Sequence, residues 1–197
     1  MMNPHDELEA LMRAMPLDWH CTAPGLRLAV DNEIDAVITV HASQVLQSPA
    51  PPADATAERR GGLRQLRLAI AARPGVTVVP LSMVDGSPLV WTLPDLRWDE
   101  TVSVALRLRV PVTRARPLHR LVPLALATLS AVAMQGEASP AVPVELQLQM
   151  GCPVLSDEEI ADFPRDPGEE RALSALVGRP VVPQAAAVPA SGDQPLH

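Results

Sequence analysis

Apolar and polar residues alternate over several short stretches of the chain, which is the pattern of strands that bury one face. The alternation is clearest over residues 102–110 and 142–150, and residues 121–134 form an uncharged run long enough for one bent strand. Shorter apolar stretches with the same character lie at 26–30, 37–40, 66–70, 76–81 and 89–93. These stretches predict a mainly β protein with about seven or eight strands.

Turn and edge signals separate these strands. Asp85-Gly86 lies between two apolar runs and predicts a tight hairpin turn there. Pro80 interrupts the 76–81 stretch, and proline cannot donate a ladder hydrogen bond, so this strand is predicted to lie at a sheet edge. The prolines and charges of residues 48–62 predict a long loop.

Helical patterns occur only near the two ends of the chain. Residues 6–15 place Leu and Met on one face before Pro16, which predicts a short N-terminal helix. Ser156 and Glu159 form a capping box that begins a helix to Phe163, and residues 168–177 predict a second one. Residues 180–197 contain four prolines among Ala, Ser and Gln, so we expect a disordered tail.

Together these elements predict an antiparallel β-sandwich with a short N-terminal helix and a small C-terminal helical appendage. The expected boundaries are an N-terminal helix at 1–16, a sandwich at 17–154, the appendage at 155–179 and the tail at 180–197. With 197 residues the chain has room for one domain, and its 47% hydrophobic content is enough for a core. Aromatic residues make up only 2%, so that core must be aliphatic.

The charge balance opposes nucleic-acid binding, because the net charge is −7 and every basic residue is Arg. A basic middle section, 61–135, lies between two acidic flanks. Either the flanks pair with the middle, or an acidic partner docks there. The chain shows no signal peptide, and its longest uncharged run is shorter than the roughly 20 residues of a membrane helix. We therefore expect a cytoplasmic protein without a membrane partner.

Candidate catalytic and metal-binding groups are sparse. His20-Cys21 offers two metal ligands without a second pair at ligand spacing, so no metal site is predicted. Cys21 and Cys152 are expected to be buried, reduced thiols. Gly61-Gly62 lacks the Lys and Ser/Thr of a phosphate loop, and no other cofactor motif is present. The sequence therefore predicts no cofactor.

A hydrolase remains the weaker alternative. His41 and Ser43 lie close in the sequence, but the Gly-x-Ser-x-Gly elbow is missing. No nucleophile, base and orienting group can be assembled from the spacing, so we predict that the chain is not an enzyme. A small hydrolase that uses His41 or His119 is the rival hypothesis.

Four residues are the candidate protein-interaction sites. Arg107 and Arg109 point the same way from one strand and can each bind a carboxylate. The chain's own acids at 157–159 and 169–170 are the competing partners. Trp91 and Trp98 are candidate interface anchors. The alternative is that they pack in the core, because the chain has few other aromatic side chains to fill it.

Four segments resemble bacterial proteins with a von Willebrand factor type A (vWA) domain. They are "LRLAV", "DAVITVHA", "LVWTLPDLRWDETVSVALRLRVPV" and "VELQLQMGCPVLSDEEIADFPRDPGEERAL", and the resemblance spans roughly residues 7–178. It concerns the β-sandwich and helical region that follows the vWA domain, with that domain itself missing. The Asp-x-Ser-x-Ser metal loop is also missing, since the nearest string, at 85–89, lacks the second Ser.

The resemblance implies a supporting role in a complex. It suggests a non-catalytic interaction or scaffold module, as the accessory subunit of a vWA-type complex. The expected partner is another protein, such as a vWA-domain protein, an AAA-type ATPase or a protein kinase. The alternative is a structural subunit of a larger homo-oligomer.

Overall fold

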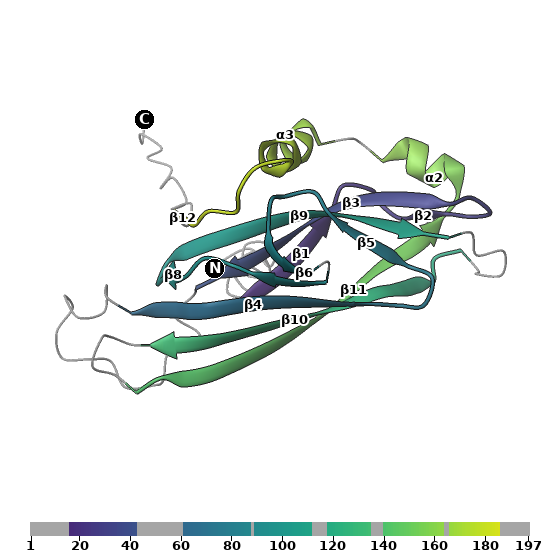
Figure 1. The fold of residues 1–197 in the computed structure, drawn as a ribbon. Coiled ribbons are helices and arrows are strands. Elements are labelled where there is room, and N and C mark those ends of the chain that lie inside the picture. The colour runs from purple at the N-terminus through teal and green to yellow at the C-terminus, as the bar shows by residue number, and fades with distance from the viewer. Residues whose placement is uncertain are drawn as a thin grey trace, which may run out of the picture.

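The computed structural model describes residues 16–42, 61–87, 89–111, 118–134, 140–163 and 166–185. These residues form two packed β-sheets with two short helices near the C-terminus, as Figure 1 shows. The helix predicted over 6–15, most of the loop predicted over 48–62 and the end of the predicted tail, 186–197, lie outside the described residues.

The smaller sheet has five strands. Strands β1, β3 and β9 lie side by side in that order, and β5 and β12 both pair with the edge of β9 that faces away from β3. The strands are β1 (Leu17–Cys21), β3 (Asn32–His41), β5 (Thr77–Pro80), β9 (Glu100–Val110) and β12 (Gln184–Ala185). All pairings in this sheet are antiparallel. Within the described chain β5 pairs with β9 alone, which confirms the prediction that the strand with Pro80 is an edge.

The larger sheet has seven strands in the order β2-β11-β10-β4-β7-β6, with β8 also paired to β4. The strands are β2 (Leu26–Arg27), β4 (Gly62–Ala72), β6 (Asp85–Ser87), β7 (Val90–Thr92), β8 (Leu96–Arg97), β10 (Leu121–Met134) and β11 (Val142–Leu155). Because β2 runs parallel to β11, this sheet is mixed, and it curls into a half-barrel. The expectation of a purely antiparallel sandwich is therefore wrong at this edge.

The alternation seen in the sequence places one face of each long strand in the core. In β3 the buried positions are aliphatic and alternate with outward-facing residues, and β9 follows the same pattern except that Ala105 is also buried. The described residues contain twelve strands rather than seven or eight. The prediction missed β1, of five residues, and several strands of two or three residues, which leave no alternation to detect. The core is aliphatic apart from Trp91, Trp98 and two sulfur-containing residues, Met150 and Cys152.

The hairpin predicted at Asp85-Gly86 is displaced. Both residues lie in β6, and Ser87 pairs with Val90 of β7, so the chain turns after Ser87. Gly86 has a φ of 129°, and a Cβ added there would lie 2.2 Å from the carbonyl oxygen of Val90. The glycine therefore permits a close strand approach instead of forming the turn.

Helices α2 (Asp157–Asp162) and α3 (Pro167–Leu176) confirm the two predicted C-terminal helices. The predicted capping box is present at Ser156, and Asp166 caps α3. In Figure 1 the helices cross the outer side of the five-stranded sheet, over β3 and β9, and neither helix contains a buried residue. No helix in the described ranges is long and apolar enough to cross a membrane.

Residues 180–185 differ from the predicted tail. Pro180 bridges to Met83, and Gln184 and Ala185 pair with the start of β9. We call residues 156–163 and 166–185 the strap, because they leave the sheet at β11, cross the sheet face as α2 and α3, and return to β9. The backbone pairing explains why this proline-containing segment lies along the sheet.

Candidate functional site

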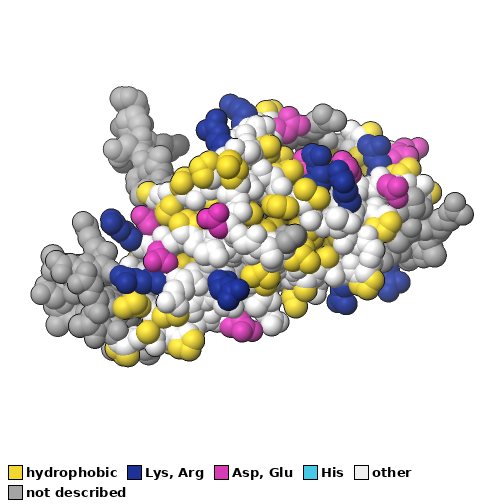
Figure 2. All heavy atoms as spheres, in the orientation of Figure 1, with side chains coloured by type: hydrophobic (Ala, Val, Ile, Leu, Met, Phe, Trp, Pro, Cys, Tyr) yellow, Lys and Arg dark blue, Asp and Glu magenta, His cyan; other side chains and the backbone are white. Residues whose placement is uncertain are grey.

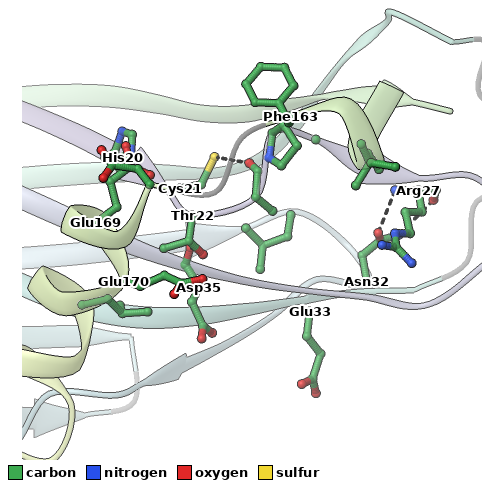
Figure 3. Close-up of a pocket in the computed structure, with 18 of the residues that line it drawn as sticks. His20, Cys21, Thr22, Arg27, Asn32, Glu33, Asp35, Phe163, Glu169 and Glu170 are labelled. Atoms are coloured by element: carbon green, nitrogen blue, oxygen red, sulfur yellow. Dashed lines mark hydrogen bonds and ion pairs between the residues drawn. The ribbon is translucent and has the colours of Figure 1, made fainter. Parts of the chain in front are cut away.

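A groove lies between the strap and the outer side of the five-stranded sheet. Its volume is about 1120 Å³, and its walls come from β1, β3, the loop that joins β1 to β2, and helices α2 and α3 (Figure 3). The groove exists because the strap is fastened at its ends while its helices bury no side chain.

The C-terminal fastening of the strap depends on Ser82, the buried polar residue between β5 and β6. Its hydroxyl donates to the carbonyl of Leu176 at 3.2 Å and accepts from the backbone N–H of Ala105 at 2.9 Å. The backbone adds two more bonds, from Gly178 N–H to Leu81 and from Met83 N–H to Arg179. These bonds hold the end of α3 against β9 and the segment after β5.

The groove lining is acidic. Six carboxylates line it, against one guanidinium, that of Arg27, and one imidazole, that of His20. The six belong to Asp31, Glu33, Asp35, Asp166, Glu169 and Glu170. Most of these groups already have partners in the chain: Asp35 and Glu33 pair with Arg107 and Arg109 of β9, His20 Nε2 lies 2.6 Å from Glu169 Oε1, and Asp166 caps α3. The balance of charge in the groove is nevertheless negative.

Apolar side chains lie among these charges. Val30, Ile160, Phe163 and Leu173 line the groove, and Phe163 is 58% exposed. Figure 3 shows Phe163 beside the end of α2 and the pair His20 and Glu169 nearer α3. A surface that combines exposed apolar groups with a charged rim is typical of a binding site for another macromolecule.

Arg107 and Arg109 project from β9 on the same side of the sheet as the strap. Arg107 makes a bidentate contact with Asp35, at 2.6 and 2.9 Å, and Arg109 donates to Glu33 at 2.8 Å. The hydrogen bonds and charge of Asp35 raise the pKa of the Arg107 guanidinium. Glu33 and Asp35 stand directly opposite the two arginines in the strand register.

This arrangement is internal pairing, one of the two alternatives for the arginine face. The acids that pair with the arginines belong to the neighbouring strand β3, however, and not to the helices, whose acids the sequence analysis names as the competing partners. In the structure Asp157 lies 3.8 Å from Arg27, and Glu169 contacts His20. In Figure 2 basic and acidic side chains are interspersed over the visible face, with apolar groups between them.

Trp91 and Trp98 lie in the core, as the packing alternative expects. Their exposed fractions are 1% and 8%. Neither ring is available to a partner in this arrangement. The indole N–H of Trp91 is buried and has no hydrogen-bond acceptor among the described residues.

Each histidine in the described chain lies against a carboxylate. His41 Nε2 is 3.3 Å from Asp18, and His119 Nε2 is 3.4 Å from Glu159. Ser43, the nucleophile of the hydrolase hypothesis, lies outside the described residues. The ranges that the structure describes contain no group of three or more His, Cys, Asp or Glu side chains that could hold a metal ion.

The structure brings together two features that sequence reasoning missed. The first is the groove itself, which depends on where the strap crosses the sheet. The second is the contact between Cys21 and Cys152, whose sulfur atoms lie 3.6 Å apart. A weak signal for the groove was present in the sequence, since α3 carries few apolar residues for a helix that covers a sheet.

The comparisons with known proteins give no further guide: no protein-family model matches the chain, and a search of curated proteins finds no match.

Proposed function

We propose that this chain is a non-catalytic protein-interaction module that binds a basic, partly apolar segment of a partner protein in the groove under the strap. The observation that carries this proposal is a groove of about 1120 Å³ whose two helical walls contribute no buried residue. Small-molecule pockets are typically about 300–1,000 Å³ and mostly apolar, so a larger, open and acidic groove suits a peptide segment better.

Charge complementarity defines the chemistry of the occupant. The negative balance of the lining would favour Lys or Arg side chains and disfavour acidic ones. The apolar groups, Phe163 above all, would receive aliphatic side chains between these charges. The occupant we propose is therefore a segment in which basic and aliphatic residues alternate or share one helix face.

The wider role is the one suggested by the resemblance. An accessory subunit of a vWA-type complex would use the groove to dock on a vWA-domain protein, an AAA-type ATPase or a kinase. Each described histidine pairs with a carboxylate, as the base of a hydrolase does, but Ser43 lies outside the described residues; alanine at His41 and His119 would test the hydrolase hypothesis.

The direct test is peptide binding measured by fluorescence anisotropy. The probe is a short labelled peptide in which Arg and Leu alternate, and the comparison peptide carries Glu in place of each Arg. We expect the basic peptide alone to bind, with an affinity that falls as salt is added. Phe163→Ser should weaken binding by about tenfold or more, because burying an aromatic ring contributes about 1.5–3 kcal/mol.

The matched control is Val182→Ser. Val182 is 54% exposed, close to the 58% of Phe163, but it does not line the groove. Binding that is equal for both peptides, or equally weakened by both substitutions, would contradict the proposal. If the peptide with Glu binds instead, and Arg107→Glu with Arg109→Glu abolishes that binding while Phe163→Ser leaves it unchanged, the arginine face is the docking site.

A second candidate, the homo-oligomeric subunit, is favoured by the open edge of β11. Within the described chain β11 pairs with β10 along its length, but on its other side β2 pairs only with Val154 and Leu155. An open edge strand can add a strand from a second copy. Light scattering should then show a homo-oligomer larger than a dimer, which Glu145→Lys with Gln147→Lys dissociates, while Ser130→Lys on the central strand β10 does not.

A further inference from the structure

The two cysteines of the chain come from different sheets and meet between them. Cys21 ends β1, at the edge of the five-stranded sheet, and Cys152 lies in β11 of the larger sheet. They are 131 positions apart in sequence, yet Cys21 Sγ lies 3.6 Å from Cys152 Sγ. A disulfide needs an S–S distance of about 2.05 Å, so the gap to close is about 1.6 Å.

The environments of the two thiols differ in a way that assigns separate roles. Cys152 is 1% exposed, whereas Cys21 is half-buried and lines the groove, so a small oxidant in the groove reaches Cys21 first. The S–H of Cys152 stabilises a Cys21 thiolate and lowers the pKa of Cys21, against the opposing effect of burial. The same contact, together with burial, raises the pKa of Cys152. The thiolate is the reactive form, which makes Cys21 the group that is oxidised.

We propose that Cys21 and Cys152 are a modification site, which forms a reversible intramolecular disulfide when a hydroperoxide oxidises Cys21. In the first step the Cys21 thiolate attacks the distal peroxide oxygen, the O–O bond breaks, and Cys21 becomes a sulfenic acid while the peroxide leaves as an alcohol, or as water. In the second step the sulfur of Cys152 attacks the sulfenic sulfur, and the hydroxyl leaves as water with the Cys152 proton. The two thiols are oxidised by two electrons in total, and the peroxide is reduced by two.

The disulfide would join the edge of the smaller sheet to β11 of the larger one. Backbone hydrogen bonds hold β1 only to β3 in the described chain, so the covalent link would add a second attachment at its C-terminal end. This end continues directly into the loop that forms one wall of the groove. The site does not depend on the proposed peptide binding, because its readout is the state of the thiols.

The test treats the full chain with hydrogen peroxide under non-denaturing conditions, then unfolds it and alkylates the remaining thiols for intact-mass analysis. In the unmodified sequence we expect both thiols to disappear together, with loss of the mass of two hydrogen atoms per chain, and to return after dithiothreitol. Cys152→Ala should leave Cys21 as a sulfenic acid that dimedone labels. Cys21→Ala should leave Cys152 far less reactive to peroxide than Cys21 is in the Cys152→Ala chain.

Three results would overturn the proposal. One is that both thiols of the unmodified sequence can still be alkylated after a peroxide treatment that lets dimedone label Cys21 in Cys152→Ala. The second is a disulfide that links two chains at every protein concentration. The third is faster oxidation of Cys152 than of Cys21 in the two single variants. The melting temperature of each variant before oxidation checks that the variant is folded. If a variant is not folded, the loss of both thiols in the unmodified sequence still tests the proposal.

Discussion

The hydroxyl of Ser82 fastens the strap to the sheet, and its removal gives a sharp test of how the groove is held open. Ser82→Ala deletes two hydrogen bonds at once, one to the Leu176 carbonyl and one from the Ala105 N–H. Ala105 is 0% exposed, so its N–H is left buried without the oxygen that accepts it. The methyl group of alanine fits the same space, and the change therefore isolates the hydrogen bonds.

The magnitude follows from the cost of an unsatisfied buried donor. Leaving such a group without a partner costs about 1–3 kcal/mol, which is larger than the net contribution of an average hydrogen bond. For a domain of this size each kcal/mol lowers the melting temperature by about 2–4 °C. We expect Ser82→Ala to lower the free energy of unfolding by about 1–3 kcal/mol, measured by urea denaturation monitored by tryptophan fluorescence.

The matched control is Ser174→Ala, on the strap itself. The Ser174 hydroxyl is exposed and donates to the Glu170 carbonyl within α3, so its loss should change stability by less than about 0.5 kcal/mol. Hydrogen exchange should also become faster in α3 of Ser82→Ala, because the strap loses a fastening at its C-terminal end. Equal stability of the two variants would refute the fastening role of Ser82.

Three further predictions concern single positions. Gly62→Ala should destabilise the fold by at least about 1 kcal/mol in urea denaturation, because a Cβ there would lie 1.9 Å from the Leu96 carbonyl oxygen. The N–H and hydroxyl of Ser156 lower the pKa of Glu159, so the capping box stabilises α2 above the ordinary pKa of 4.5 and is lost as pH falls through the lowered value. The protection of α2 amides from hydrogen exchange, corrected for the intrinsic rate at each pH, should fall there, and Glu159→Gln should remove this pH dependence. Trp91→Phe should change the unfolding free energy by only about 1 kcal/mol, against about 3–5 kcal/mol for Trp91→Ala, because removal of the unpartnered indole N–H offsets part of the lost packing.

Much of the architecture could be predicted from local signals. The alternation over 102–110 and 142–150 reports which residues face the core, because successive side chains of a strand point to opposite faces. Pro80 marks an edge strand for a local reason, its missing N–H, and Ser156 marks a helix start by its spacing from Glu159. These features involve residues close in sequence, so no knowledge of the fold was needed.

The partners of the charged and sulfur-containing side chains were decided by tertiary structure. The sequence shows that Arg107 and Arg109 share one face of a strand. Which carboxylates they bind depends on the register between β3 and β9, which joins residues more than seventy positions apart. The contact between Cys21 and Cys152 likewise needs the β1 edge to pack against β11. The sequence pattern determined which residues point inward or outward, because that depends on neighbours along the chain. Only the packing of the two sheets and the path of the strap decided which of those residues meet, because strand order and register are set by long-range burial that no local pattern records.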